Sequence, residues 1–167
     1  MAYLLDANVF IQAKNLHYGM DFAPGFWDWL ILAHSQGRLL SIEKVGEELA
    51  AGQDELAAWA GTLAPGFFAS AEASTAASLS TVATWVDGQD FRPSAVGTFL
   101  QVADFYLVSQ ALAGGHTVVT HEVFSPGVAK VKIPNVCLGV GVGCITTFEM
   151  LRKERVRLTL APVTASE

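Results

Sequence analysis

Short apolar runs alternate with helical stretches along this chain, and this alternation restricts the possible folds more than any other feature. The runs are short and apolar rather than alternating, as in parallel strands covered on both faces, and lie at residues 2–5, 39–42, 117–120 and 135–140. Apolar residues at helical spacing mark the stretches at residues 24–36, 43–59 with a break near Gly52, 73–86, 94–113 and 146–155. Strands alternating with helices predict an α/β fold, a three-layer α/β/α sandwich with a central parallel sheet.

The composition limits both the size of the fold and its partners. The 167 residues suit one domain with a sizeable core. Only 16 % of them are charged, below the roughly 25 % of soluble domains, so we expect apolar surface to be covered in a homodimer or a heteromer. The net charge of −6 argues against a broad nucleic-acid-binding face, but it allows an acidic metal site that acts on nucleic acid.

The sequence predicts neither membrane insertion nor export. Gly, Pro, Ser or Thr interrupts the longest uncharged stretches, so we expect none of them to span a bilayer. No basic segment precedes an apolar run at the N-terminus, so we expect no signal peptide and a cytoplasmic location. Cys137 and Cys144 do not form a CxxC pair, and we expect reduced thiols in the core.

Acidic residues follow two of the predicted strands. Asp6 comes directly after the first strand, and Glu122 follows residues 117–120 by two positions. Ligands of open parallel sheets bind beyond the carboxyl ends of the strands, where both acids are expected. Thr120 is placed to orient a neighbouring carboxylate or a water molecule. The alternative for Asp6 or Asn8 is a role as the cap of the next helix.

Two further acids lie on predicted helices. Asp104 falls inside the apolar stripe of its helix, within about 60° of Leu107 and about 40° of Val108. A carboxylate in that position needs a metal ion, strong hydrogen bonds or, as the alternative to a functional role, a salt bridge to Lys or Arg. Glu48 flanks the apolar stripe of the helix that starts at Glu43, where it either leans over the sheet edge or faces solvent.

A cluster of carboxylates at one edge of a sheet repels itself, and the repulsion raises the pKa of at least one member. A divalent cation removes this repulsion, and a donor set made only of oxygen suits Mg²⁺ or Mn²⁺. Metal-assisted hydrolysis of a phosphodiester is the natural chemistry of such a site.

The order and wording of these acids resemble a PIN domain, the metal-dependent ribonuclease fold of VapC-type toxins. The family's opening strand with D-x-N resembles LLDANVF, and its E-L-x-x-G helix resembles VGEELAAG. Its A-D-x-x-[IL]-[AV] helix resembles ADFYLVSQAL, and its [ST]-x-[DE] strand end resembles TVVTHE. FWDWL and KIPNVC are similar to a less characterised bacterial branch of the superfamily. The resemblance implies that residues 1–167 form a single PIN-like domain.

The resemblance also implies roles for individual residues. It implies that four acids are catalytic ligands of Mg²⁺ or Mn²⁺: Asp6, Glu48, Asp104 and Glu122. It implies that Asn8 and Thr120 orient these ligands or the attacking water. Many relatives carry Asp at the position of Glu122, so the reach of that carboxylate differs here. His121, between two inward-facing neighbours, either faces solvent or contacts substrate.

Basic side chains near the acids are candidates for substrate binding. Lys130 and Lys132 alternate along one side of an extended segment, where they hold RNA phosphates, pair with the acids or face solvent. Lys14 is a further candidate for binding substrate.

The resemblance implies an endoribonuclease that is the toxin of a type II toxin–antitoxin pair, inhibited by a small protein antitoxin. One alternative is a catalytically silent PIN-fold protein that binds a partner, and the presence of all four acids counts against it. Another is a PIN-like nuclease that acts on structured DNA, and the small size and lack of a basic arch count against it.

Overall fold

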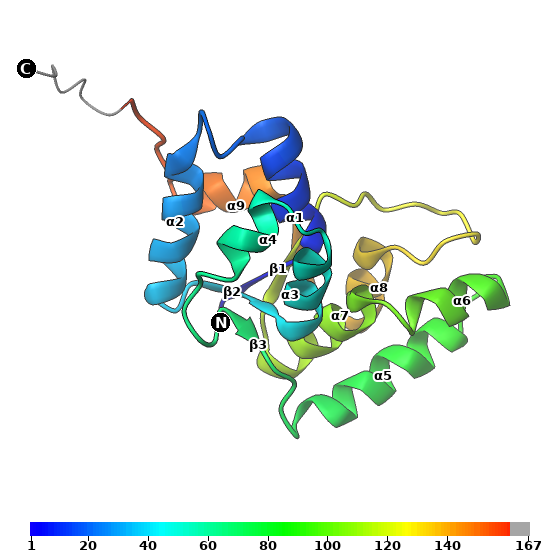
Figure 1. Ribbon diagram of the computed structural model, residues 1–167. Helices are drawn as coiled ribbons and strands as arrows, with labels where there is room; N and C mark the ends of the chain where they lie inside the picture. The colour runs from blue at the N-terminus through cyan, green and yellow to red at the C-terminus, as the bar shows by residue number, and fades with distance from the viewer. Residues whose placement is uncertain (161–167) are drawn as a thin grey trace, which may run out of the picture.

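A five-stranded, fully parallel sheet forms the centre of the structure, a computed structural model that describes residues 1–160 (Figure 1). Its strands are β1 (Tyr3–Leu5), β2 (Leu39–Ile42), β3 (Phe68–Ala69), β4 (Thr117–Val119) and β5 (Gly143–Ile145), in the order β3-β2-β1-β4-β5. The helices are α1 (Ala7–Gln12), the π-helical η1 (Ala13–His17), α2 (Pro24–Ser35), α3 (Glu43–Ala51), α4 (Glu55–Ala60), α5 (Thr75–Asp87), α6 (Pro93–Phe99), α7 (Ala103–Gly114), α8 (Ile133–Val140) and α9 (Thr147–Lys153). The predicted α/β/α sandwich with a parallel sheet is confirmed. The predicted domain also includes residues 161–167, which lie outside the described residues.

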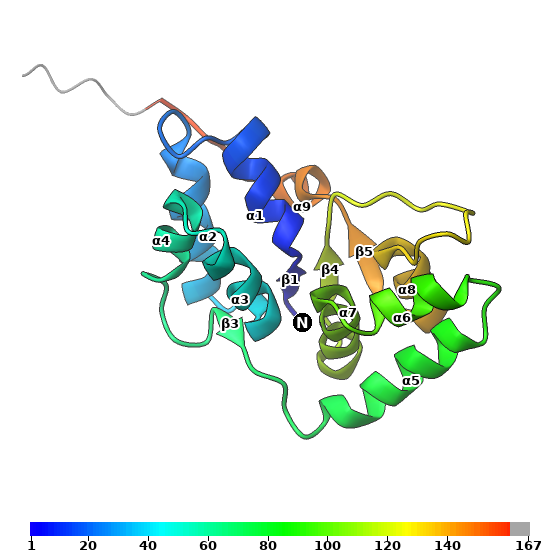
Figure 2. The same cartoon turned by 45° about the vertical axis from the view of Figure 1, so that its right-hand side comes forward.

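The chain crosses the sheet in two directions. It steps from β1 to β2 to β3, and then returns past β1 to β4 and β5. Because parallel connections are right-handed, the two directions place their helices on opposite faces. Thus α2 packs against β2 on one face, whereas α7 contacts β2 and β4 on the other, with α5 and α8 beside it (Figure 2). The direction reverses between β1 and β4, and this switch point is where parallel sheets bind ligands.

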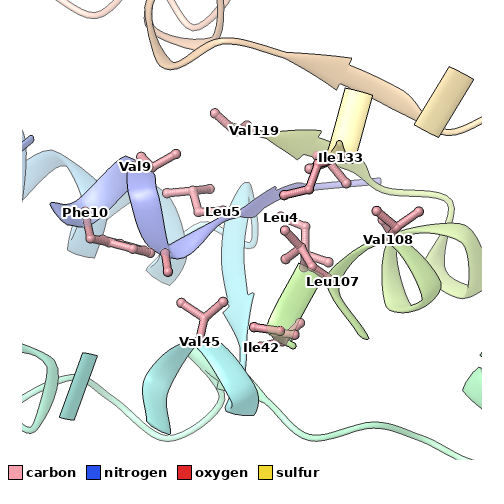
Figure 3. Packing of buried hydrophobic residues seen from close by; sticks show 14 of the residues in the cluster. Leu4, Leu5, Val9, Phe10, Ile42, Val45, Leu107, Val108, Val119 and Ile133 are labelled. Carbon is pink, nitrogen blue, oxygen red and sulfur yellow. The ribbon is translucent and has the colours of Figure 1, made fainter. Parts of the chain in front are cut away.

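The strands are apolar because both faces of the sheet are covered. Consecutive strand residues point to opposite faces. In Figure 3, Leu4 lies beside Leu107 of α7, while Leu5 lies toward Val9 of α1. All four side chains are at most 1 % exposed. Burial of each contributes roughly 1.5–3 kcal/mol, which explains why β1 carries no alternating polar residues.

The predicted strand at residues 135–140 is wrong. These residues belong to α8, and the strand of this region is β5, which follows it. Pro134 lies in the first turn of α8, where its missing N–H costs no helical hydrogen bond. Gly141 ends the helix with φ of 75°, a left-handed conformation that favours glycine. Both residues are helix signals that outweigh the apolar run between them.

Two predicted helices are divided. The stretch 94–113 forms α6 and α7, so Asp104 lies in the first turn of α7 instead of mid-helix. The stretch 43–59 breaks near Gly52, as predicted, and gives α3 and α4. Strand β3 has no counterpart among the predicted elements, because a strand of 2 residues has no pattern to detect.

Candidate functional site at the carboxyl ends of β1 and β4

Asp6 and Thr120 lie side by side at the switch point of the sheet. Leu5 pairs in register with Val119, so the next residues leave the two strands at the same level. The Thr120 hydroxyl donates a hydrogen bond to Oδ2 of Asp6 at 2.7 Å, and both side chains are buried. The parallel register therefore joins two residues that are 114 positions apart in the sequence.

The Thr120 hydroxyl is the centre of a small network. It accepts hydrogen bonds from Nδ2 of Asn8 at 3.3 Å and from the N–H of Glu122 at 3.0 Å. A hydroxyl has two lone pairs and one hydrogen, so that hydrogen remains for Asp6. The N–H of His121 donates to Oδ1 of Asn8 at 3.1 Å, which fixes the orientation of the amide. Asn8 therefore orients Thr120, and Thr120 orients the Asp6 carboxylate.

Asp6 occupies the N-cap position of α1 but does not cap the helix, because its side chain makes no capping hydrogen bond. It is 4 % exposed, and no Lys or Arg among residues 1–160 forms an ion pair with it. Burial raises the pKa of Asp6 to about 7, although the Thr120 hydrogen bond opposes the shift. Three neighbouring carboxylates raise the pKa of Asp6 further: Asp104, Glu122 and Glu48. Because its side chain makes no capping hydrogen bond, Asp6 is not a side-chain cap of α1, and that alternative is wrong.

Asp104 is half-buried in the first turn of α7, and Val108 one turn later is fully buried, as the helical spacing predicts. No Lys or Arg in the described part of the chain forms an ion pair with Asp104, so the salt-bridge alternative is absent there. Burial raises the pKa of Asp104 to about 6. The negative charge of Glu122 also raises the pKa of Asp104, the positive charge of Lys130 lowers this pKa, and the negative charge of Glu48 raises it.

Glu122 has a different environment from the two aspartates. Its Oε1 accepts hydrogen bonds from Nζ of Lys130 at 3.0 Å and Nζ of Lys132 at 3.1 Å. Its Oε2 accepts from the N–H of Ile133 at 2.8 Å, at the N-terminus of α8. Burial acts to raise the pKa of Glu122, but these donors outweigh burial and leave the pKa below its usual value. In the structure, Lys130 and Lys132 therefore pair with an acid, Glu122, which was one of the alternatives given for them.

Glu48 and Lys14 differ in their relation to these acids. Glu48 is exposed on α3, and its charge acts on both Asp6 and Asp104. Lys14 instead forms an ion pair with Asp54, the N-cap residue of α4. Glu48 is therefore near enough for its charge to act on the two aspartates, whereas Lys14 is engaged by Asp54.

Two contacts at or beside the site were not predicted from the sequence, one made by the backbone of Ile133 and one by the ring of His121. The N–H of Ile133 holds Glu122, and the incorrect strand prediction concealed it. The His121 ring packs against His17 and Phe148, with centroids 5.5 and 5.7 Å away, and its Nε2 lies 3.0 Å from Oγ1 of Thr147. His121 therefore faces a cluster of side chains and not open solvent. These contacts join separate segments of the chain, so no local sequence pattern predicts them.

The chemistry of the donors fits a hard divalent cation. Asp6 and Asp104 have raised pKa values and no basic partner in residues 1–160, and a cation would favour their ionised forms. Across the same residues, however, no three His, Cys, Asp or Glu side chains are already grouped to hold a metal ion. The oxygens of Glu122 are engaged by Lys130 and Lys132. Asp6 and Asp104 are therefore the pair that best fits a cation.

Comparison with protein families gives a match over residues 3–158, which include all four acids, to a family described as a domain of unknown function, DUF4411. The chain belongs to the DUF4411 family. No curated protein and no solved structure matches this DUF4411 chain. None of the helices in residues 1–160 has both the length and the apolar character needed to cross a membrane.

Proposed function

We propose that this DUF4411 protein is an endoribonuclease that depends on Mg²⁺ or Mn²⁺. The proposal is carried by Asp6 and Asp104, whose pKa values are raised to about 7 and about 6 beside the switch point of a parallel sheet. Carboxylates desolvated without a counter-charge lower the stability of a fold, and a bound cation would offset that cost. The resemblance of four stretches to PIN domains supports the same activity.

Each acid has a distinct part in the proposed site. Asp6 and Asp104 would hold the cation, with Glu48 at the margin and Glu122 beside them. When bound, Mg²⁺ or Mn²⁺ supplies positive charge that stabilises the negative charge developing on the phosphodiester. Thr120 engages Oδ2 of Asp6 and leaves Oδ1 without a hydrogen bond from the described residues. The direction in which Asp6 presents its free oxygen is therefore set before any ligand arrives.

Lys130 and Lys132 give the negatively charged chain a local means of holding RNA. Each ammonium group has three N–H donors, and each donates one hydrogen bond to Glu122. The Lys130 side chain is 64 % exposed, so its remaining donors are open to an RNA phosphate.

The resemblance to VapC-type toxins leads us to propose two further properties. They are membership of a type II toxin–antitoxin pair and inhibition by a small protein antitoxin. The low share of charged residues, 16 %, leads us to propose assembly of the chain into a homodimer as well. Exposed apolar side chains support contacts with other chains, since Leu16, Phe22 and Leu32 are 70 %, 69 % and 52 % exposed. Sedimentation of the purified chain, alone and with a candidate antitoxin, tests both associations.

Two observations favour a second function, that of a catalytically silent protein of the same fold that binds a partner. Glu122 is paired with Lys130 and Lys132, and no ready-made group of three metal-binding side chains exists within residues 1–160. Under this alternative the acids would contact basic groups of a partner protein.

Incubation with Mn²⁺ and a mixed pool of RNA separates the two functions. The proposal predicts cleavage by the wild type and by Asp28→Asn, a matched change at an exposed aspartate of α2. It predicts at least about a hundredfold slower cleavage by Asp104→Asn. Structured DNA in a parallel reaction tests the remaining alternative substrate. The proposal is contradicted if the wild type does not cleave RNA, or if Asp104→Asn cleaves RNA as fast as the wild type does.

A further inference from the structure

A pocket of about 220 Å³ opens beside the acids, between α6, the first turn of α7 and the connection that leads to α8. Figures 1 and 2 both show this connection reaching over α6. The N–H of Arg92 donates to the carbonyl of Val128 at 3.0 Å and ties the connection to the start of α6. The pocket is therefore held by two segments that lie far apart in the sequence.

The pocket and the acids share two residues. Asp104 and Lys130 line the pocket, and Lys130 also donates to Glu122. The charge on Glu122 acts on Asp104, and the charges on both act on Asp6. A group bound in the pocket therefore lies next to the place where a phosphodiester would be cut.

The lining combines apolar walls with a few polar groups. Ala95, Phe99 and Val131 are nearly fully buried and give the walls, while Ser94 and Thr98 stand at the exposed rim. The Thr98 hydroxyl donates to the Ser94 carbonyl at 2.9 Å, so its oxygen is left as an acceptor. The Ser94 hydroxyl has no hydrogen bond to the described residues and is free to donate.

We propose that this pocket receives one unpaired nucleobase of the RNA and so determines the sequence at which the chain cuts. This inference rests on the proposed ribonuclease function and names its specificity site. A nucleobase has flat apolar faces and an edge that carries both donors and acceptors, which the walls and the rim can match. The volume is below the roughly 300–1,000 Å³ of pockets for drug-sized ligands, in keeping with a single base. Asp104 and Lys130 give the pocket lining one charge of each sign, so it lacks the excess of positive charge that would favour a phosphate there.

The test measures which base the protein prefers, separately from cleavage. Fluorescent homopolymers of A, U, C and G are titrated onto Asp6→Asn, in which the proposed cation ligand outside the pocket is lost. We expect the tightest homopolymer to bind at least about tenfold more strongly than the weakest. Ala129→Phe places a ring at the pocket from an exposed position and should reduce this preference to less than about threefold. Ala77→Phe, at an exposed position of α5, is the matched control and should preserve it.

A second variant avoids filling the pocket. Ser94→Ala removes the free donor and should weaken binding of the preferred base about threefold to tenfold while the melting temperature stays unchanged. Equal affinity for all bases, preference retained in Ala129→Phe, or no binding of any RNA overturns the inference. Base preference lost in Ala129→Phe, together with no cleavage by the wild type, supports the pocket and rejects the nuclease. Cleavage by the wild type together with equal affinity for all bases supports the nuclease and rejects the pocket as its specificity site.

Discussion

The hydroxyl of Thr120 donates a 2.7 Å hydrogen bond to Oδ2 of Asp6, from the end of β4 to the end of β1. The same oxygen accepts from Asn8 and from the N–H of Glu122, so one buried hydroxyl connects three groups of the acidic site. The orientation of Asp6 thus depends on a side chain that would not itself hold a cation.

Replacement of Thr120 by Val keeps the shape of the side chain and removes the hydroxyl. Two donors, on Asn8 and Glu122, lose their acceptor, so we expect the free energy of unfolding to fall by about 1–3 kcal/mol. The pKa of Asp6 should rise further, because the Thr120 hydrogen bond acts to lower it. Urea denaturation and NMR titration of the carboxyl measure the two effects. Thr120→Ser keeps the hydroxyl, and an equal rise of the Asp6 pKa in Ser and Val variants would refute this role.

The raised pKa values of Asp6 and Asp104 predict how stability depends on pH. In the unfolded chain both carboxyls ionise near pH 4, whereas in the fold their pKa values are about 7 and about 6. Between these limits the folded state binds more protons, so these two groups make the free energy of unfolding fall as pH rises from about 4 to about 7. Glu122, with its lowered pKa, acts in the opposite sense only at the acidic end of this range.

Asp6→Asn removes the buried charge and leaves an oxygen for the Thr120 hydroxyl. In a chelator at about pH 8, we expect this variant to melt at least about 2 °C above the wild type. The gap should narrow near about pH 5, where wild-type Asp6 is itself protonated. Thermal scans at both pH values measure this, with Asp28→Asn as the control. A lower melting temperature for Asp6→Asn at the higher pH would show that the charged form of Asp6 stabilises the fold.

Lys130 and Lys132 hold Glu122 in its ionised form. Their joint replacement by Met should raise the pKa of Glu122, since both hydrogen bonds act to lower it. The free energy of unfolding should fall by about 1–3 kcal/mol, because the Glu122 side chain is only 10 % exposed and loses two hydrogen bonds from charged donors. Carbon-13 NMR titration of Glu122 and measurement of RNA affinity check the two roles, with Lys153→Met on α9 as the control. An unchanged Glu122 pKa would mean that the N–H of Ile133 alone holds this carboxylate.

Gly141 and Gly97 form a matched pair for testing the end of α8. Gly141 has φ of 75°, so Gly141→Ala should lower the free energy of unfolding by about 1–2 kcal/mol. Gly97 lies within α6, and a Cβ there would meet nothing within 4 Å, so Gly97→Ala should raise stability by about 0.5–1 kcal/mol. Urea denaturation measures both. A loss in both variants would contradict this assignment.

The fold class and the meeting of Asp6 with Thr120 could be predicted because both follow from strand patterns. Short apolar runs without polar alternation predict a covered parallel sheet, and the carboxyl ends of parallel strands share one edge. Asp104 was recognisable because Leu107 and Val108, which share its face, had to be buried. These inferences need only the local sequence and the geometry of regular elements.

The environment of Glu122 could not be predicted in the same way. The largely apolar residues 135–140 suit a strand or a buried helix, and only Pro134 and Gly141 distinguish the two. Without α8, the N–H of Ile133 had no reason to point at an acid. The ion pair between Lys14 and Asp54 depends on how η1 and α4 pack, which no spacing in the sequence encodes. Contacts between separate segments decided which charges remain unpaired.

Calorimetric titration of the purified protein with Mn²⁺ tests most directly whether Asp6 and its neighbours hold a divalent cation. Affinity should increase from about pH 6 to about pH 8, with release of protons, because the carboxyls must ionise to bind. We predict saturable binding by the wild type and by Asp28→Asn, and at least about tenfold weaker binding by Asp6→Asn. Binding that is absent from the wild type, or equally strong in Asp6→Asn, would contradict the account.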